Sequence, residues 1–145
     1  MSTPLFYKYS ITIKADADKV WDALTNPEMT KQYMFGCKAI TDWKVGSEVI
    51  WKGATDGIIY VKGHVVKFEP NSVLAFTVFD PNGTYEDIPE NYLTGEYRLS
   101  YSDSETTLDI SQGDYSVVAD GEQRYKDADK GWKMAMGGLK KLVEG

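Results

Sequence analysis

The segment 121–143 is the sequence feature that most restricts how this chain can fold. Its apolar residues recur at the three- and four-residue spacing of a helix, which predicts one long helix with a bulky apolar side. The segments before it are patterned as strands, so the helix needs a broad sheet surface to cover that side. The apolar side comprises Tyr125, Ala128, Trp132, Ala135, Met136, Leu139, Leu142 and Val143.

Six earlier segments have the apolar and polar pattern of half-buried strands. Turn-forming residues separate most of them, and the short connections favour antiparallel neighbours. Gly63 predicts a bulge in the third of these strands. The stretch 36–46 is interpreted as a polar loop. The predicted strands are residues 8–14, 48–52, 58–69, 73–79, 93–101 and 106–113.

Two short helices are predicted between the first two strands. Asp16 and Asn26 stand where a side-chain oxygen can accept hydrogen bonds from the free amides of a helix start. Pro27 suits the first position of the second helix, which ends near Tyr33. With the long C-terminal helix, this order predicts an α+β fold in which a six-stranded antiparallel sheet holds that helix.

The composition argues against several classes of function. The chain has 22 acidic and 16 basic residues and a net charge of −6, which repels phosphate backbones, so nucleic-acid binding is not expected. Cys37 and His64 are the only residues of their types, so we expect neither an intrachain disulfide nor a metal site. Nucleotide-binding glycine motifs are absent, so no cofactor is expected. Without a signal peptide or an apolar span, the expected location is the cytoplasm, away from membranes.

Three segments in the expected order resemble the helix-grip fold of the START and birch-pollen-allergen superfamily, also called SRPBCC. They are residues 19–28 (KVWDALTNPE), 63–74 (GHVVKFEPNSVL) and 131–140 (GWKMAMGGLK). The last one is similar to the Gly-Trp helix of the subfamily related to the C-terminal domain of the activator of heat shock protein 90 ATPase. The resemblance spans nearly the whole chain, so residues 1–145 are interpreted as one domain of this kind.

The resemblance implies a curved sheet that grips the C-terminal helix, with an apolar cavity between the two. It also implies a relationship to chaperone partners and the stress response. One departure concerns the loop after the second helix, where the family often has a Trp and this chain has Tyr33, Met34 and Phe35. We therefore expect the mouth of the cavity to differ in shape.

The leading hypothesis is non-enzymatic binding of a small hydrophobic or amphipathic molecule, by a monomer or a homodimer. Aromatic side chains that face the space between sheet and helix carry this hypothesis, although aromatics at such spacing can also simply fill a core. Inward tyrosines favour internal hydrogen bonds or a wet pocket, because a buried hydroxyl without a partner costs roughly 1–3 kcal/mol. The candidate ligand-binding residues are Trp51, Tyr60, His64, Phe76, Tyr97, Tyr125, Trp132 and Met136.

Two other classes of function stay open. One is a co-chaperone-like protein interaction, which the family resemblance implies. The other is catalysis on an aromatic substrate, for which His64 with Tyr60 or Tyr97 would supply acid–base groups. The residue types form no competent catalytic set, and Cys37 is interpreted as an inert loop thiol, so no catalytic residue is assigned.

Gly131, Gly137 and Gly138 lie within the predicted C-terminal helix, where each lowers helix stability by about 1 kcal/mol relative to Ala. Close approach of the helix backbone to the sheet is the favoured reason for them, and a bend or loosened segment that opens the cavity is the alternative. Trp132 is the expected anchor of the helix. If it is fully buried, Trp132→Ala should destabilise the protein by about 3–5 kcal/mol.

Overall fold

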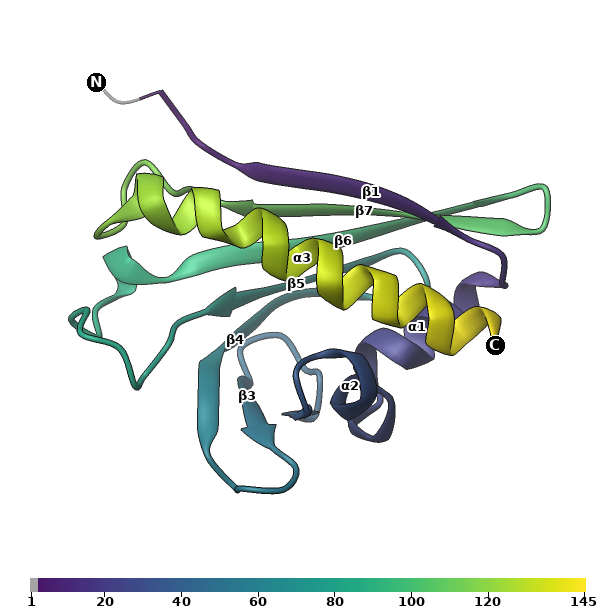
Figure 1. The fold of residues 1–145 in the computed structure, drawn as a ribbon, viewed down its shortest axis with the longest axis horizontal. Helices are drawn as coiled ribbons and strands as arrows, with labels where there is room; N and C mark the ends of the chain where they lie inside the picture. Colours follow the sequence, from purple (N-terminus) through teal and green to yellow (C-terminus); the bar gives the residue numbers. More distant parts are fainter. Residues whose placement is uncertain (1–2) are drawn as a thin grey trace.

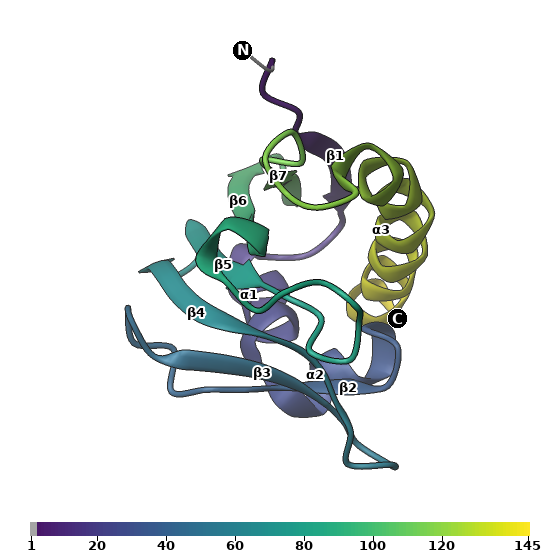
Figure 2. The same ribbon diagram turned by 90° about the vertical axis from the view of Figure 1, so that its left-hand side faces the viewer.

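A curved sheet of seven antiparallel strands holds the long C-terminal helix against its concave side (Figures 1 and 2). The computed structural model describes residues 3–145. The predicted α+β helix-grip fold is confirmed. The elements are β1 (Tyr7–Ile13), α1 (Ala17–Thr25), α2 (Pro27–Tyr33), β2 (Cys37–Ile40), β3 (Glu48–Gly53), β4 (Ile59–Glu69), β5 (Val73–Val78), the short 3₁₀ helix η1 (Pro89–Asn91), β6 (Leu93–Ser102), β7 (Glu105–Gly113) and α3 (Gly121–Glu144).

The strand order in the sheet is β1-β7-β6-β5-β4-β3-β2, so each strand from β2 to β7 lies beside its neighbour in sequence. The predicted count of six strands was wrong because β2 was missed. This strand runs antiparallel to β3, from Cys37 opposite Gly53 to Ile40 opposite Ile50. It has only four residues and two buried side chains, which is too short to produce a periodic signal.

The predicted bulge at Gly63 was also wrong in position. The register between β3 and β4 shifts at Trp51/Lys52, and the register between β4 and β5 shifts at Val65/Lys67. Gly63 has a different structural reason, because a Cβ atom there would lie 1.7 Å from the carbonyl oxygen of Thr77. The glycine therefore allows β4 to pass close to the β5 backbone.

The two short helices begin differently. Asn26 accepts a 3.0 Å hydrogen bond from the Glu28 amide through its side chain, as predicted, and Pro27 occupies the first turn of α2. Asp16 precedes α1 but makes no side-chain cap; its carboxylate accepts instead from the Tyr101 hydroxyl at 3.0 Å. Pro27 also leaves the Ala23 carbonyl without its usual amide donor, and the Tyr33 hydroxyl donates to that carbonyl at 2.7 Å.

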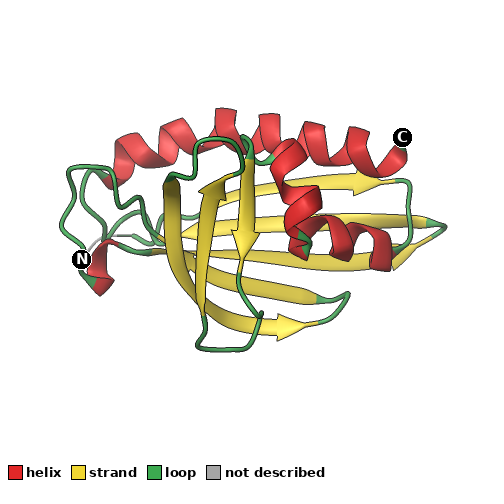
Figure 3. Ribbon diagram, turned by 90° about the horizontal axis from the view of Figure 1, so that it is seen from below, coloured by secondary structure: helices red, strands yellow, loops and turns green. Residues whose placement is uncertain are grey.

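The helices α1 and α2 pack beneath the C-terminal half of α3 (Figures 1 and 3). At this end the core is filled by aliphatic side chains that have no solvent exposure or almost none. The N-terminal half of α3 lies over the sheet and packs against the loop that follows β7, and among residues 3–145 no other α-helix lies under it (Figure 3). The fully buried core side chains include Ile13, Leu24, Leu74, Leu108, Met136 and Leu139.

Candidate functional site

An open cavity of about 760 Å³ lies between the N-terminal half of α3 and the sheet. Its walls come from α3, from the strands β2 to β7, and from the loop that follows α2. Most of the lining is aromatic or aliphatic. The aromatic lining residues are Phe35, Trp51, Tyr60, Phe76, Tyr97, Tyr115 and Trp132.

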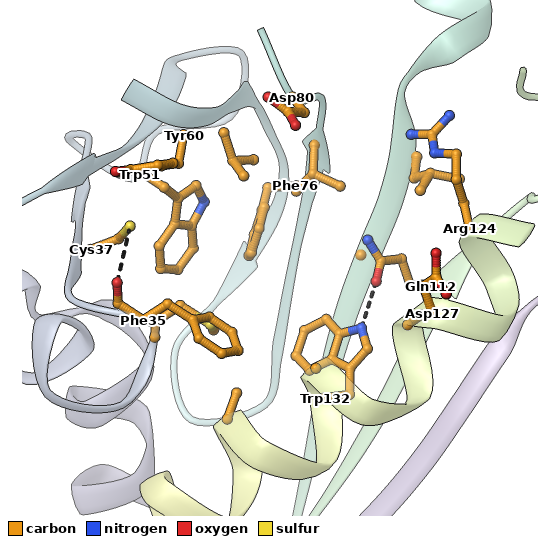
Figure 4. Close-up of a pocket in the computed structure, with 18 of the residues that line it drawn as sticks. Phe35, Cys37, Trp51, Tyr60, Phe76, Asp80, Gln112, Arg124, Asp127 and Trp132 are labelled. Carbon is orange, nitrogen blue, oxygen red and sulfur yellow. Dashed lines mark hydrogen bonds between the residues drawn. The ribbon is translucent and has the colours of Figure 1, made fainter. Parts of the chain in front are cut away.

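Four of these rings form a continuous series across the cavity wall, from β3 to α3. The ring centroids of Trp51 and Phe76 are 5.8 Å apart, and those of Phe76 and Tyr97 are 6.1 Å apart. Tyr97 then meets Trp132 edge to face at 5.8 Å. Such separations are those of attractive aromatic pairs, so the wall holds its shape through ring contacts. Figure 4 shows Trp51 and Phe76 on one side of the space and Trp132 on the other.

Polar groups gather at the opposite end of the cavity, near the start of α3. Gln112 on β7 accepts a 2.5 Å hydrogen bond from the indole nitrogen of Trp132 (Figure 4). Arg124 donates to the Ala119 carbonyl at 3.1 Å, and its guanidinium lies 4.7 Å from the centre of the Tyr85 ring. The carboxylates of Asp80 and Asp127 also line the cavity, and Figure 4 shows Asp127 near Gln112 and Asp80 nearer Phe76. The cavity is therefore amphipathic along its length.

The structure brings five of the eight predicted ligand-binding residues together at the cavity. These are Trp51, Tyr60, Phe76, Tyr97 and Trp132. Tyr60 is 41% exposed and donates a 2.5 Å hydrogen bond to Asp56, which places it at the outer edge.

The other three predicted residues lie elsewhere. His64 is exposed on β4, and its backbone amide donates to Thr77. Tyr125 packs edge to face against Tyr7 and Tyr115, and Met136 is fully buried in the core. With His64 outside the cavity lining, the acid–base pairing of His64 with Tyr97 has no geometric basis.

Tyr97 is the wall residue with the most unusual environment. Its side chain is 2% exposed, and its hydroxyl has no hydrogen-bond partner among residues 3–145. Burial raises the pKa of this hydroxyl well above its usual range, so it stays protonated at physiological pH. Of the two outcomes predicted for inward tyrosines, internal hydrogen bonds or a wet pocket, the first is not met at Tyr97. The buried Tyr33 hydroxyl, by contrast, does have an internal partner.

Cys37 lies on β2 and lines the cavity, so its placement in a loop was wrong. The thiol is buried and lies 3.9 Å from the Phe35 carbonyl oxygen. Burial raises the pKa of the thiol, and the nearby Asp56 carboxylate raises it further. A thiol with a raised pKa is a weak nucleophile, which agrees with an inert role.

The mouth of the cavity is formed in part by the residues after α2. Met34 and Phe35 both line it, and the Phe35 side chain is 62% exposed. Phe35 has a φ angle of 53° and Gly36 one of 78°, so two successive residues in left-handed conformations turn the chain here. Two of the residues at which this chain departs from the family pattern, Met34 and Phe35, therefore line the cavity.

The three glycines of α3 have different surroundings. A Cβ atom at Gly138 would lie 3.1 Å from the Cβ of Tyr33, so this glycine allows close approach to α2 and not, as predicted, to the sheet. Nothing lies within 4 Å of a Cβ placed at Gly131 or Gly137, so close approach does not explain those two. Gly131 lines the cavity, whereas Gly137 is exposed on the outer side of the helix.

Trp132 is only partly buried. The predicted loss of about 3–5 kcal/mol for Trp132→Ala required full burial, so that requirement is not met.

Sequence reasoning missed the polar end of the cavity. Gln112 follows Leu108 and Ile110 on the inward side of β7, and this alternation was the available signal. Arg124 and Asp127 occupy polar positions of an amphipathic helix, and nothing in their spacing distinguishes them from solvent-exposed residues.

Residues 3–145 contain no group of three or more His, Cys, Asp or Glu side chains arranged to hold a metal ion. No helix in that range is both long and apolar enough to cross a membrane.

Residues 14–144 match the family model described as activator of Hsp90 ATPase homolog 1-like protein. The chain belongs to this family. The match covers most of the chain, and the predicted resemblance to the SRPBCC superfamily and to this subfamily is confirmed. No curated protein matches the chain.

Three solved structures illustrate the likeness in fold. ChR145 from Cytophaga hutchinsonii is 34% identical, with a TM-score of 0.80 over 99% of this chain and 97% of that one. The Aha1 dimer from Colwellia psychrerythraea is 18% identical, with a TM-score of 0.71 over 97% and 96% of the two chains. An Hsp90 activator from Plasmodium falciparum, PFC0360w, is 14% identical, with a TM-score of 0.62 over 76% and 73%. At 18% and 14% identity, the last two structures show a shared fold and nothing about function.

Proposed function

We propose that this chain binds a small hydrophobic or amphipathic molecule in the cavity between the sheet and the N-terminal half of α3. The observation that carries this proposal is the aromatic wall from Trp51 to Trp132, which faces an open space of about 760 Å³. Ligand pockets of proteins fall between roughly 300 and 1,000 Å³ and combine an apolar lining with a few polar groups. The cavity here has both properties.

The chemistry of the lining favours binding over catalysis. The carboxylate residues at the cavity are Asp80 and Asp127, which are exposed to solvent, and Glu96, whose carboxylate is paired with Arg98. The buried ionisable groups of the lining are Cys37, Tyr97 and Tyr115, and burial holds all three in their protonated forms. Protonated groups of this kind are poor bases at physiological pH, whereas rings and methyl groups supply contact area for a ligand.

A cavity-filling variant tests the proposal. Gly131→Leu directs a side chain into the cavity from a position where a Cβ meets nothing within 4 Å. Gly137→Leu is the matched control, because its Cβ is equally unobstructed but lies on the exposed side of the same helix. Both changes add helix propensity, so both variants should fold.

The measurement is tryptophan fluorescence and thermal shift with a panel of fatty acids, sterols and polycyclic aromatic compounds. We expect at least one class to bind the parent protein and Gly137→Leu with equal affinity. Binding to Gly131→Leu should weaken by roughly tenfold or more, because the added side chain occupies the ligand volume. A panel with no binder, or equal binding to all three proteins, would refute the cavity as the site.

A co-chaperone role is the second candidate, favoured by membership of the family and by the fold shared with Hsp90 activators. Its test is stimulation of the ATPase of an Hsp90 from the same organism by the purified chain. If that ATPase rate is unchanged at saturating concentrations of the chain, the co-chaperone role is excluded. Gly131→Leu separates the two roles, because it should weaken ligand binding without altering an interaction through the outer surface.

A further inference from the structure

The orientation of the Gln112 side chain in the cavity is fixed by its neighbour Trp132. The indole nitrogen of Trp132 is a donor only, so the amide atom that faces it at 2.5 Å must be the acceptor, Oε1. This assignment turns the Nε2 nitrogen, with its two N–H groups, away from Trp132 and toward the space beside Phe76 (Figure 4). The hydrogen bond therefore positions a donor inside the cavity.

The Gln112 amide nitrogen has no hydrogen bond to any other residue in the range 3–145, whereas the oxygen of the same amide is used. The side chain is half-buried, and its position on β7 places it among the lining residues. A fixed donor with free N–H groups suits an acceptor oxygen on a bound molecule, because a polar group of the pocket left unpaired lowers affinity.

The charges that line the cavity argue against a carboxylate as that acceptor. Glu96 is paired with Arg98, which leaves two negative charges on Asp80 and Asp127 and one positive charge on Arg124. The Arg124 guanidinium already contacts the Ala119 carbonyl and the face of Tyr85. An anionic head group would gain one attraction and meet two repulsions, in a chain whose net charge is −6.

We propose that the cavity selects an uncharged, planar aromatic compound with a carbonyl oxygen that accepts a hydrogen bond from the Gln112 amide. The rings of this compound lie against the accessible rings of Phe35 and Trp132, and the carbonyl faces β7. Trp132 acts as a positioning residue, because its indole nitrogen holds the amide in the donating orientation. This inference rests on the proposed binding function and assigns its ligand class.

Three compounds with the same ring skeleton test the assignment by calorimetry. Xanthone carries the carbonyl, xanthene lacks it, and xanthone-2-carboxylate adds a negative charge. We expect xanthone to bind the parent protein roughly three- to tenfold more tightly than xanthene, the effect of one net hydrogen bond. Xanthone-2-carboxylate should bind more weakly than xanthone, with the difference reduced by added salt.

Gln112→Glu is the decisive variant, because its carboxylate still accepts from Trp132 but has no N–H to donate. At pH 8 it should bind xanthene as the parent does and lose the preference for xanthone. Trp132→Phe, which frees the amide to rotate, should reduce the xanthone-to-xanthene preference without abolishing it. This affinity ratio reports on the donor, since a change in stability alone would affect both compounds equally.

Several results would overturn the assignment. One is equal binding of xanthone and xanthene to the parent protein, and another is a preference that survives in Gln112→Glu. Tighter binding of xanthone-2-carboxylate than of xanthone would mean that the polar end binds anions through Arg124. If none of the three compounds binds while another class in the panel does, the ligand class is wrong and the proposed binding function stands. If no class binds at all, the proposed function itself fails.

Discussion

The two halves of α3 present similar apolar sides to very different surroundings. In the C-terminal half, Met136 and Leu139 have no solvent exposure, and Gly138 lies against Tyr33. In the N-terminal half, Gly131 and Trp132 border an open cavity. The difference comes from α1 and α2, which fill the space under one half only. One half of the helix is therefore expected to provide stability, and the other is free to contact a ligand.

The largest expected effect is at the packed half. Leu139→Ala removes a fully buried side chain among well-packed neighbours and should lower the free energy of unfolding by about 2–5 kcal/mol. Urea unfolding followed by circular dichroism measures this loss. The affinity of the folded fraction of this variant for ligand should equal that of the parent protein. A loss below about 1 kcal/mol would mean that this end is not closely packed.

A pair of tyrosines gives the next largest contrast. The Tyr33 hydroxyl supplies the donor that the Ala23 carbonyl lacks, so Tyr33→Phe should destabilise the protein by about 1–3 kcal/mol. The Tyr97 hydroxyl is buried without a partner, so Tyr97→Phe should be neutral or stabilise by about 1 kcal/mol. Urea midpoints of the two variants test this difference in sign. Equal losses would show that the Tyr97 hydroxyl has a partner in solution.

Alanine at two glycines of the same helix sharpens the comparison further. Gly131→Ala adds a Cβ to empty space and should stabilise the protein by about 0.5–1 kcal/mol through helix propensity. Gly138→Ala gains the same propensity but meets the Tyr33 Cβ at 3.1 Å, so its net change should be smaller or destabilising. Thermal midpoints of the two single variants measure the difference. A higher thermal midpoint for Gly138→Ala than for Gly131→Ala would contradict the assignment of the close contact to the C-terminal half of α3.

The smallest expected effect on stability is at the mouth. Phe35 is 62% exposed, so Phe35→Ala should change the free energy of unfolding by less than about 0.5 kcal/mol. The same change should weaken xanthone binding, because this ring lines the cavity. Calorimetric titration beside urea unfolding separates the two quantities. Unchanged xanthone affinity would remove Phe35 from the site.

Much of the fold was predictable because periodicity reports which face of an element is apolar. The predicted helix at 121–143 agrees with Gly121–Glu144, and the other strands were found near their observed bounds. The four residues of β2 were missed because a strand this short has no period. Periodicity does not show which residues, or which cavity, the apolar face of an element packs against. Tyr125 and Met136 share a stripe with Trp132, yet Tyr125 packs against Tyr7 and Met136 lies in the filled core.

The polar end of the cavity depends on tertiary structure in the same way. Gln112 becomes notable only because the helix carries Trp132 to within hydrogen-bonding distance of β7. His64 is the opposite case, since a chemically conspicuous residue turns out to lie on the exposed side of β4. Residue type alone therefore overestimated one position and overlooked another.

The most direct test of the contrast between the two halves uses the indole N–H signals in an NMR titration with xanthone. Trp51 and Trp132 line the cavity, whereas Trp21 lies on α1, where it packs against Phe68. We expect the Trp51 and Trp132 signals to shift with a common dissociation constant while the Trp21 signal stays in place. A Trp21 shift as large as that of Trp132, or no shift at any indole, would contradict the account.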